Sequence, residues 1–263
     1  MYTGVISKMR NEYKDPINYY LMIDGQEIFL NELLNQHISL KWLSTVECMC
    51  KKRFPKFYRQ NFCYQCYWNA PQASLSIFKP ELCTADLNIE ERDLDWEKKF
   101  QISPHYIYLA NSSKIKVGIT RKGQQITRWM DQGAVQAIIL AEVPNRRLSG
   151  LIEVELKQYV ADKTNWRKML SGIPDPVDLV SQKNIFVQHL PDELKKYAVS
   201  DDTVVKLTYP IEAYPSKIKS LKLEKVNQVQ GILKGIKGQY LIFEDSTVFN
   251  VRSHQGFVVD FSC

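Results

Sequence analysis

Apolar and polar residues alternate along both ends of the chain, a pattern typical of β-strands. Near the start, Tyr2 to Met9, Tyr19 to Ile23 and Glu27 to Leu30 are predicted strands. Asp24-Gly25 between the last two strands indicates a tight hairpin. Toward the end we expect strands at Val204 to Leu207, Gln230 to Leu233, Tyr240 to Phe243, Val248 to Val251 and Phe257 to Phe261.

The two ends also resemble each other in order and approximate spacing. Gly4-Val5-Ile6-Ser7 corresponds to Gly231-Ile232-Leu233-Lys234, and a later apolar strand and hairpin follow each of them. An isolated hairpin is only marginally stable in water. We therefore expect the two ends to pack together into one β platform. Chance similarity between two hairpin-rich segments is the alternative.

The middle of the chain is predicted to form strand, strand, helix, strand and helix. Tyr106 to Ala110 and Ile115 to Thr120 are rich in strand-forming residues. The elements expected after them are a helix carrying Ile126, Trp129 and Met130, a strand from Val135 to Glu142 and a helix from Leu151 to Val160. This order predicts an α+β fold with a central three-stranded, mainly antiparallel sheet and helices.

Changes in composition divide the chain into four segments. Residues 1–44 form an N-terminal β segment, residues 45–101 a cysteine-rich module, and residues 102–172 the central sheet and helices. Residues 173–263 begin with a proline-containing linker and end in a C-terminal β segment that we expect to pack with the N-terminal one.

Composition limits the class of protein. Apolar residues make up 44% and charged residues 24%, which is ordinary for a globular chain. The start lacks the pattern of a signal peptide, and no apolar run is long enough to span a membrane. We therefore expect a cytoplasmic protein without membrane contact. The net charge of +6 is compatible with a polyanionic partner, but a solvated surface explains it equally well.

Four of the six cysteines are clustered in the sequence as Cys48-Met49-Cys50 and Cys63-Tyr64-Gln65-Cys66. Two short cysteine pairs can supply the four tetrahedral ligands of a structural zinc ion. The alternatives are four buried free thiols or one redox-active pair. Between and after the pairs, cations alternate with aromatic side chains, which suits a nucleic-acid strand or the core of a small metal-held module. These residues are Lys51, Lys52, Arg53, Phe54, Lys56, Phe57, Tyr58, Arg59, Phe62, Tyr64, Tyr67 and Trp68.

Five short motifs in the central segment resemble the GIY-YIG nuclease superfamily. In order they are Tyr106-Ile107-Tyr108, Lys116-Val117-Gly118, Arg128, Glu153 and Asn165. The resemblance implies a Mg²⁺-dependent endonuclease that cleaves phosphodiester bonds in DNA or RNA. It implies that Tyr108 is a general base or positions water, that Arg128 stabilises the transition-state phosphate, and that Glu153 binds Mg²⁺.

The resemblance further implies that Lys116 belongs to the catalytic set and that Tyr106, Gly118, Arg121 and Asn165 contact the substrate. It also implies that Tyr108, Lys116, Arg128 and Glu153 converge on one cleft. Two positions depart from the superfamily pattern, because Tyr106 replaces a glycine and Lys116 replaces a tyrosine. The alternatives are a non-catalytic nucleic-acid-binding protein with the nuclease fold, or a protein-interaction scaffold. The oligomeric state is open.

Longer strings resemble an uncharacterised bacterial family known only as a domain of unknown function. They include Pro80-Glu81-Leu82-Cys83, the stretch from Arg128 to Ala134, and Gly235 to Leu241. That resemblance implies an architecture but no activity, and its two Cys-x-x-Cys pairs differ from Cys48-Met49-Cys50. Asp162 and Lys163 follow the helix of Glu153, where they are either turn residues or the rim of the same cleft.

Overall fold

The computed structural model describes residues 1–160 and 165–263, and these residues form two compact units. The first unit comprises Met1–Tyr67, Leu170–Gly172 and Leu207–Cys263. The second comprises Trp68–Met169 and Ile173–Lys206. Asp162 and Lys163 lie outside the described residues. Among the described helices, none is long and apolar enough to cross a membrane.

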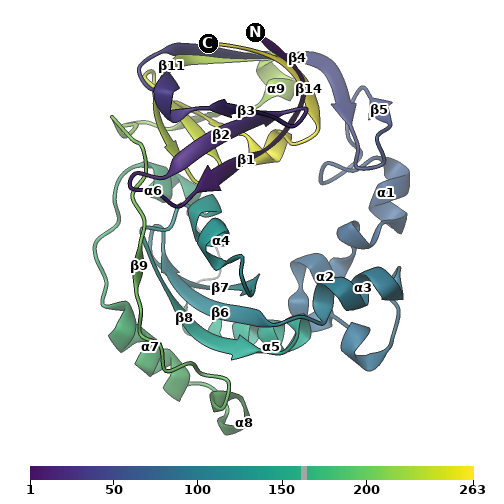
Figure 1. Ribbon diagram of the computed structural model, residues 1–263, viewed down its shortest axis with the longest axis vertical. Coiled ribbons are helices and arrows are strands. Elements are labelled where there is room, and N and C mark those ends of the chain that lie inside the picture. The colour runs from purple at the N-terminus through teal and green to yellow at the C-terminus, as the bar shows by residue number, and fades with distance from the viewer. Residues whose placement is uncertain (161–164) are drawn as a thin grey trace. The chain divides into compact units, whose positions relative to one another are not determined.

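The first unit is built on one large, mostly antiparallel sheet (Figure 1). Over the described residues the strand order is β10-β13-β12-β11-β4-β14-β1-β2-β3, and β5 pairs with β4. The strands are β1 (Tyr2–Glu12), β2 (Asn18–Ile23), β3 (Gln26–Phe29), β4 (His37–Glu47), β5 (Arg53–Phe54), β10 (Lys219–Leu221), β11 (Gln228–Lys237), β12 (Tyr240–Phe243), β13 (Thr247–Asn250) and β14 (Phe257–Ser262). Short helical turns join them: η1 (Asn31–Leu33), α9 (Leu223–Val226) and η5 (Arg252–His254).

The two ends of the chain exchange strands within this sheet. The first half of β1 pairs with β14, and the first half of β11 pairs with β4. β4 and β14 then pair with each other, so that Leu40 lies opposite Phe261. Gly4 in β1 and Gly231 in β11 occupy equivalent places, opposite Val259 and Ile38. Strands from the two similar ends therefore lie in one sheet.

The second unit contains an antiparallel sheet of order β7-β6-β8-β9. Its strands are β6 (His105–Asn111), β7 (Ile115–Arg121), β8 (Gln136–Val143) and β9 (Val205–Lys206). Its helices and helical turns are η2 (Pro71–Ala73), α2 (Leu75–Phe78), η3 (Pro80–Leu82), η4 (Ala85–Leu87), α3 (Leu94–Gln101), α4 (Gln125–Asp131), α5 (Arg146–Leu156), α6 (Trp166–Leu170, whose last residue belongs to the first unit), α7 (Leu179–Gln188) and α8 (Asp192–Lys195). α1 (Tyr64–Asn69) lies at the boundary of the two units.

Successive side chains of each strand point to opposite faces of this sheet. Different helices cover the two faces, α4 on one and α5 on the other (Figure 1). Ile107 and Val117 point to the face where Ile152 and Leu156 of α5 complete an apolar core. On the opposite face, the ring of Tyr108 meets Trp129 of α4, with 5.8 Å between ring centroids. The edge strand β7 therefore lies between α4 on one face and α5 on the other.

Two expectations about the central elements need correction. Among the described residues the central sheet has four strands rather than three, because β9 pairs with Gln136 and Ala137 of β8. The last central helix runs from Arg146 to Leu156 rather than from Leu151 to Val160. Asn145 starts that helix early, because its side chain accepts a hydrogen bond from the backbone N–H of Leu148 at 2.8 Å.

The compact units also divide the chain differently from the four segments read from its composition. The cysteine-rich segment 45–101 is split at Tyr67, because its second half packs against α5. Residues 173–206 belong with the central sheet, because α7 packs against β8 and β9 extends the sheet. A linker alone therefore does not describe this stretch.

Gly150 allows α5 to approach the chain at η3. A Cβ atom built on Gly150 would lie 2.5 Å from the carbonyl carbon of Pro80 and would clash with the backbone nitrogen of Glu81. Backbone atoms cannot move aside as a flexible side chain can. The absence of a side chain at this position thus lets residues 80–82 cover one side of α5.

We predict that Gly150→Ala destabilises the protein by about 2 kcal/mol, although alanine is the better helix former. The physical reason is the clash with the backbone at Pro80 and Glu81. Urea denaturation of the purified variant measures the change. Gly172→Ala is the control, because no atom lies within 4 Å of the added Cβ. Equal stability of the two variants would contradict the prediction.

Candidate functional site

Charged side chains from three elements of the second unit line a small cavity, called the basic pocket here. Its volume is about 120 Å³. The lining residues are Ile77, Phe78, Pro80, Lys116, Val117, Gly118, Ile119, Arg128, Gln132, Arg146 and Glu153. On the scale of the roughly 30 Å³ that a water molecule occupies in the liquid, the volume suits a group of phosphate size.

Local structure explains why these side chains meet. Lys116 and Gly118 are two residues apart on the edge strand β7 and so share one face. Arg128 and Gln132 are four residues apart at the end of α4. Arg146 and Glu153 are seven residues apart on α5, which is two helical turns, so both lie on one side of that helix.

The two guanidinium groups of the basic pocket are incompletely hydrogen-bonded. The Nε atoms of Arg128 and Arg146 are buried and have no hydrogen-bond partner among the described residues. The Nη2 of Arg146 donates to the carbonyl oxygen of Ile77 at 2.8 Å, and its Cζ lies 5.2 Å from the centre of the Phe100 ring. Burial lowers the pKa of Arg146, and Arg128 acts in the same direction. An anion in the pocket would reduce the electrostatic repulsion between the guanidinium groups of Arg128 and Arg146.

Glu153 is the carboxylate of the basic pocket. Its Oε2 lies 3.3 Å from the Nζ of Lys157, one turn along α5, and its side chain is 12% exposed. Glu153 belongs to no group of three or more His, Cys, Asp or Glu side chains among the described residues that could hold a metal ion. A hard cation held there would need water or ligand oxygens to complete its coordination.

Tyr108 lies behind the pocket wall and reaches it through its hydroxyl group. The hydroxyl donates to Oε1 of Gln132 at 2.8 Å. A Cβ atom on Gly118 would lie 2.6 Å from the same hydroxyl, so only glycine leaves room for it. Burial raises the pKa of Tyr108, although Arg128 and Gln132 act in the opposite direction. The phenol therefore stays protonated at neutral pH and acts as a hydrogen-bond donor.

The structure thus brings Lys116, Arg128 and Glu153 together, with the Tyr108 hydroxyl one hydrogen bond away at Gln132. Of the residues expected to contact a substrate, Gly118 lines the same pocket. The other three, Tyr106, Arg121 and Asn165, do not line it.

Those three residues have other contacts. The ring of Tyr106 lies 5.7 Å from the Nζ of Lys122. The guanidinium of Arg121 is 5.0 Å from the centre of the Phe100 ring, and its Nη2 donates to the Phe100 carbonyl at 3.4 Å. Asn165 accepts a hydrogen bond from the backbone N–H of Lys168 and so caps α6.

Sequence reasoning missed Arg146. It was detectable from spacing, since Arg146 precedes Glu153 by seven residues. The missing information was that α5 begins before Leu151, which puts Arg146 on the same helix as Glu153.

A second site lies in the first unit, where four cysteine sulfur atoms gather. The Sγ atoms of Cys48, Cys50, Cys63 and Cys66 all lie within 4.8 Å of one another. Zn–S bonds of about 2.3 Å in a tetrahedron would place sulfur atoms roughly 3.8 Å apart. The cluster could therefore hold a metal ion such as zinc with little adjustment, even though its first pair is spaced Cys-x-Cys.

Two turns bring the cysteine pairs together. Cys48 and Cys50 lie at the tip of the β4–β5 hairpin, where Lys51 has a φ of 66° and its N–H donates to the Cys48 carbonyl at 2.8 Å. Cys63 directly precedes α1, and Cys66 lies within it. The backbone N–H of Cys63 donates to the Sγ of Cys48 at 3.2 Å, which ties the two turns to each other.

The charge of these thiols depends on whether a cation is bound. Burial raises the pKa of Cys66 to about 12, and its three neighbouring thiols act in the same direction. Four thiolates therefore do not coexist here unless a positive ion compensates their charge. Cys83 and Cys263 are free cysteines outside the cluster.

Comparison with known proteins identifies a family but no activity. Residues 35–259 match a family described as "Protein of unknown function (DUF2797)". No curated protein matches the chain, and no solved structure matches it either.

We predict that the purified protein contains about one zinc ion per chain and that Cys63→Ser removes it, because three thiolates bind zinc less tightly than four. Elemental analysis measures the metal, and a thermal scan should show a lower unfolding midpoint. Cys263→Ser, at an exposed thiol outside the cluster, should keep both values. A folded protein without stoichiometric metal, in which all four thiols react freely, would contradict the prediction.

Proposed function

The chain belongs to the DUF2797 family, and we propose that it is a nucleic-acid-processing protein, a Mg²⁺-dependent endonuclease of the GIY-YIG type that cleaves phosphodiester bonds at the basic pocket. The observation that carries this proposal is the gathering of Lys116, Arg128, Arg146 and Glu153 around one cavity of phosphate size. Three cations and one carboxylate suit a phosphate ester together with a metal ion.

The order of elements supports the GIY-YIG assignment. The motif of Tyr106 and Tyr108 lies on β6, and that of Lys116 and Gly118 lies on the adjacent β7, with Tyr108 directly opposite Gly118. Arg128 and Glu153 come from α4 and α5, on the two faces of this sheet. Lys116, Arg128 and Glu153, which the resemblance links in sequence, thus also lie near one another in space.

The cations would bind and polarise the phosphate. A guanidinium group contacts two phosphate oxygens at once, and the unpaired buried Nε atoms of Arg128 and Arg146 are donors suited to that task. Because both groups are held in a partly buried pocket, they would stabilise the charge that develops on the oxygens in the transition state.

Glu153 is the residue that would hold Mg²⁺. Such an ion neutralises charge on the phosphate and lowers the pKa of a bound water. The lone carboxylate leaves most coordination positions to water and substrate oxygens, which is how Mg²⁺ is usually bound at phosphate-processing sites. Lys157, now 3.3 Å from Glu153, would have to release the carboxylate.

Tyr108 fits the water-positioning role better than the general-base role. Its raised pKa keeps the hydroxyl protonated, and the hydroxyl already donates to Gln132. A donor fixed in this way orients the amide of Gln132 at the pocket wall. The free end of that amide would then hold a water molecule or a phosphate oxygen.

Zinc would have a structural role in this proposal. Four thiolate ligands leave no open position for a reacting water. The ion would fix the β4–β5 hairpin against α1, across a segment with little other regular structure.

One observation favours a second candidate function, nucleic-acid binding without cleavage. Lys116 occupies the place of the tyrosine in the second GIY-YIG signature, and its side chain is almost completely buried. With Arg128 and Arg146 it makes the pocket strongly cationic, which suits an anion that is bound and not cleaved.

We predict Mg²⁺-dependent cleavage of DNA or RNA by the purified protein, and Glu153→Gln should lower its rate at least about 100-fold. The substitution removes the charge that would hold the metal while keeping the size of the side chain. Gel analysis of labelled substrates measures the rate.

Glu155→Gln is the matched control, because Glu155 lies on the same helix, outside the pocket, and contacts Gln158. It should cleave at the wild-type rate. Salt-dependent binding without cleavage of varied DNA and RNA substrates would reject the nuclease proposal in favour of the binding-only function.

We also predict that affinity for nucleic acid decreases as the salt concentration rises, because contacts with phosphates release bound counterions. Lys52 and Lys56 are both exposed near the cysteines. Lys52→Gln or Lys56→Gln should reduce the slope of log affinity against log salt concentration by about 1 per lost contact. Lys14→Gln, at an exposed lysine between β1 and β2, should leave the slope unchanged. A complete lack of binding at low salt would contradict both candidate functions.

A further inference from the structure

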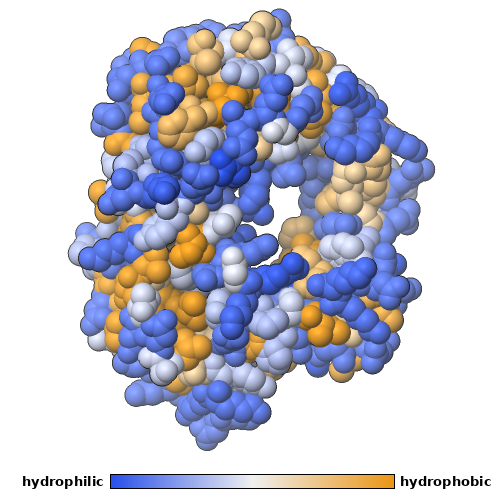
Figure 2. Space-filling view, in the orientation of Figure 1, coloured by the Kyte–Doolittle hydropathy of each residue, from blue (hydrophilic) through white to orange (hydrophobic). Residues whose placement is uncertain are grey.

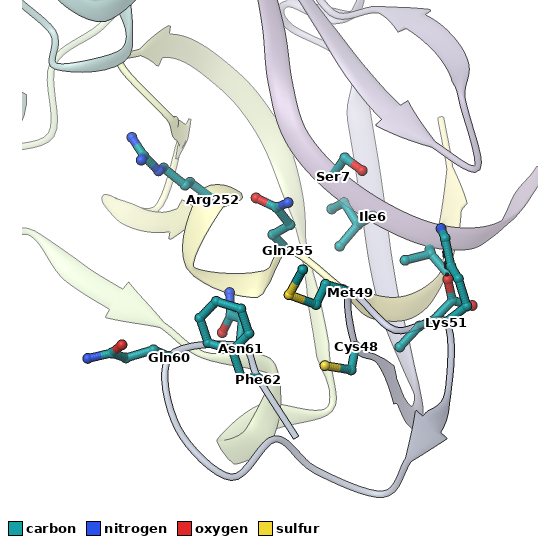
Figure 3. A pocket seen from close by; sticks show the side chains of 13 residues that line it. Ile6, Ser7, Cys48, Met49, Lys51, Gln60, Asn61, Phe62, Arg252 and Gln255 are labelled. Atoms are coloured by element: carbon teal, nitrogen blue, oxygen red, sulfur yellow. Dashed lines mark hydrogen bonds and ion pairs between the residues drawn. The ribbon is translucent and has the colours of Figure 1, made fainter. Parts of the chain in front are cut away.

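A second and larger cavity lies beside the cysteine cluster in the first unit, and it is called the amide pocket here. Its volume is about 330 Å³, within the range of small-ligand sites. It is formed by β1, by the segment from Glu47 to Phe62, and by the residues around η5 (Figure 3). The lining residues are Val5, Ile6, Ser7, Glu47, Cys48, Met49, Lys51, Gln60, Asn61, Phe62, Arg252, Gln255 and Gly256.

Unused amide groups distinguish this cavity. The side chains of Gln60, Asn61 and Gln255 make no hydrogen bonds with the residues that the structure describes. Each amide offers a donor and an acceptor side by side. Apolar surface lies next to them, because Met49 and Phe62 line the same cavity (Figure 3).

The turn that presents two of these amides has an unusual backbone. Gln60 and Asn61 have φ angles of 51° and 61°, both in the left-handed region. Hydrogen bonds from Phe62 N–H to the Arg59 carbonyl and from Tyr58 N–H to the Phe62 carbonyl, each of 2.8 Å, close the turn. Glycine would form such a turn with less strain, since a left-handed residue with a Cβ costs about 1 kcal/mol. The left-handed backbone at Gln60 is explained if the glutamine side chain serves to bind a ligand.

Positive charge surrounds the cavity. From Cys48 to Tyr67 the sequence has five Lys or Arg residues and no Asp or Glu, and two of the five, Lys51 and Arg53, form ion pairs of 3.3 Å with Glu47 at the pocket. Four thiolates on one Zn²⁺ would contribute a charge of about −2, so this stretch would remain positive. Figure 2 shows a mainly hydrophilic surface over β5 and its neighbouring loops. Arg252 adds a further exposed cation at the pocket.

We propose that the amide pocket binds one unpaired base of a single-stranded nucleic acid, with the adjoining phosphates on the surrounding lysine and arginine side chains. A base has a flat apolar face and an edge of alternating donors and acceptors. Phe62 and Met49 suit the face, and the amides of Asn61 and Gln255 suit the edge. The proposal rests on nucleic acid being the partner, as proposed above, but it does not depend on cleavage.

A peptide would also find apolar and amide groups in this cavity. Charge favours the nucleic acid, because the five cations of this stretch outnumber the one carboxylate that pairs with two of them, Glu47, and a surplus of positive charge favours a polyanion over a peptide of mixed composition. The basic pocket of the second unit differs in kind, since it is smaller and is lined by charged groups with a single amide, Gln132.

The test compares a short single strand of DNA with a fully abasic strand of equal length, by fluorescence anisotropy without Mg²⁺. The wild-type protein should bind the base-bearing strand at least about fivefold more tightly, because one bound base is worth that much or more. Gln255→Ala and Asn61→Gly should each reduce this preference. Glycine is chosen at position 61 because it keeps the left-handed turn while removing the amide.

Gln26→Ala is the control, because Gln26 is an exposed amide at the β2–β3 turn, outside the pocket. It should keep the full preference, and the zinc content and unfolding midpoint of all variants should match the wild type. The proposal would be overturned if the wild-type protein showed no preference for the base-bearing strand, or if both pocket variants kept the full preference. Equal, salt-dependent binding of the two strands would overturn this proposal but leave the proposed function intact. Failure to bind either strand, and an RNA strand of the same sequence, would reject the proposed function as well.

Discussion

The pairing of β4 with β14 is the constraint on which the first unit depends. It joins residues near position 40 to residues near position 260, and each strand then pairs with a strand from the other end of the chain. Neither end could form its sheet alone, since a short hairpin is marginally stable. β4 also continues directly into Cys48, so the cysteine hairpin extends from a strand that is paired on both sides.

In the second unit, the position of β7 at the edge of its sheet has a comparable effect. β7 pairs with β6 on one side, and among the described residues no strand pairs with its other side. Helices from both faces of the sheet can therefore bring side chains around that edge. Arg128 arrives from one face and Glu153 from the other, whereas an interior strand would have kept them apart. Gly118 on β7 completes the arrangement by leaving room for the Tyr108 hydroxyl.

Local spacing was enough to predict some of these features. The Asp24-Gly25 hairpin, the strands β6 and β7 and the cysteine cluster all depend on residues close together in the sequence. β4 was not predicted, because the residues that pair with it, such as those opposite Lys41, come from positions 228 and 260. α7 was not predicted, since its N-cap Asp178 and its buried Leu179 directly follow the linker that contains Pro174 and Pro176.

The candidate site was predictable to a similar extent and for similar reasons. A motif order linked Lys116, Arg128 and Glu153, but nothing in that order required Arg146, whose contribution depends on where α5 begins. The role of Tyr108 also needed the structure, because a tyrosine in a strand can face solvent or core. Full burial is what raises its pKa and makes it a donor to Gln132.

The two cavities differ in chemistry in a way that matches the two parts of a nucleotide. The basic pocket has three cations and a carboxylate but little apolar surface that could hold a base. The amide pocket has neutral amides and apolar side chains, together with Glu47, Lys51 and Arg252. In the proposed function, the first would act on the phosphate, which is the same in every nucleotide, and the second would hold a base. Each cavity is lined within its own unit, so either activity could persist if the other were lost.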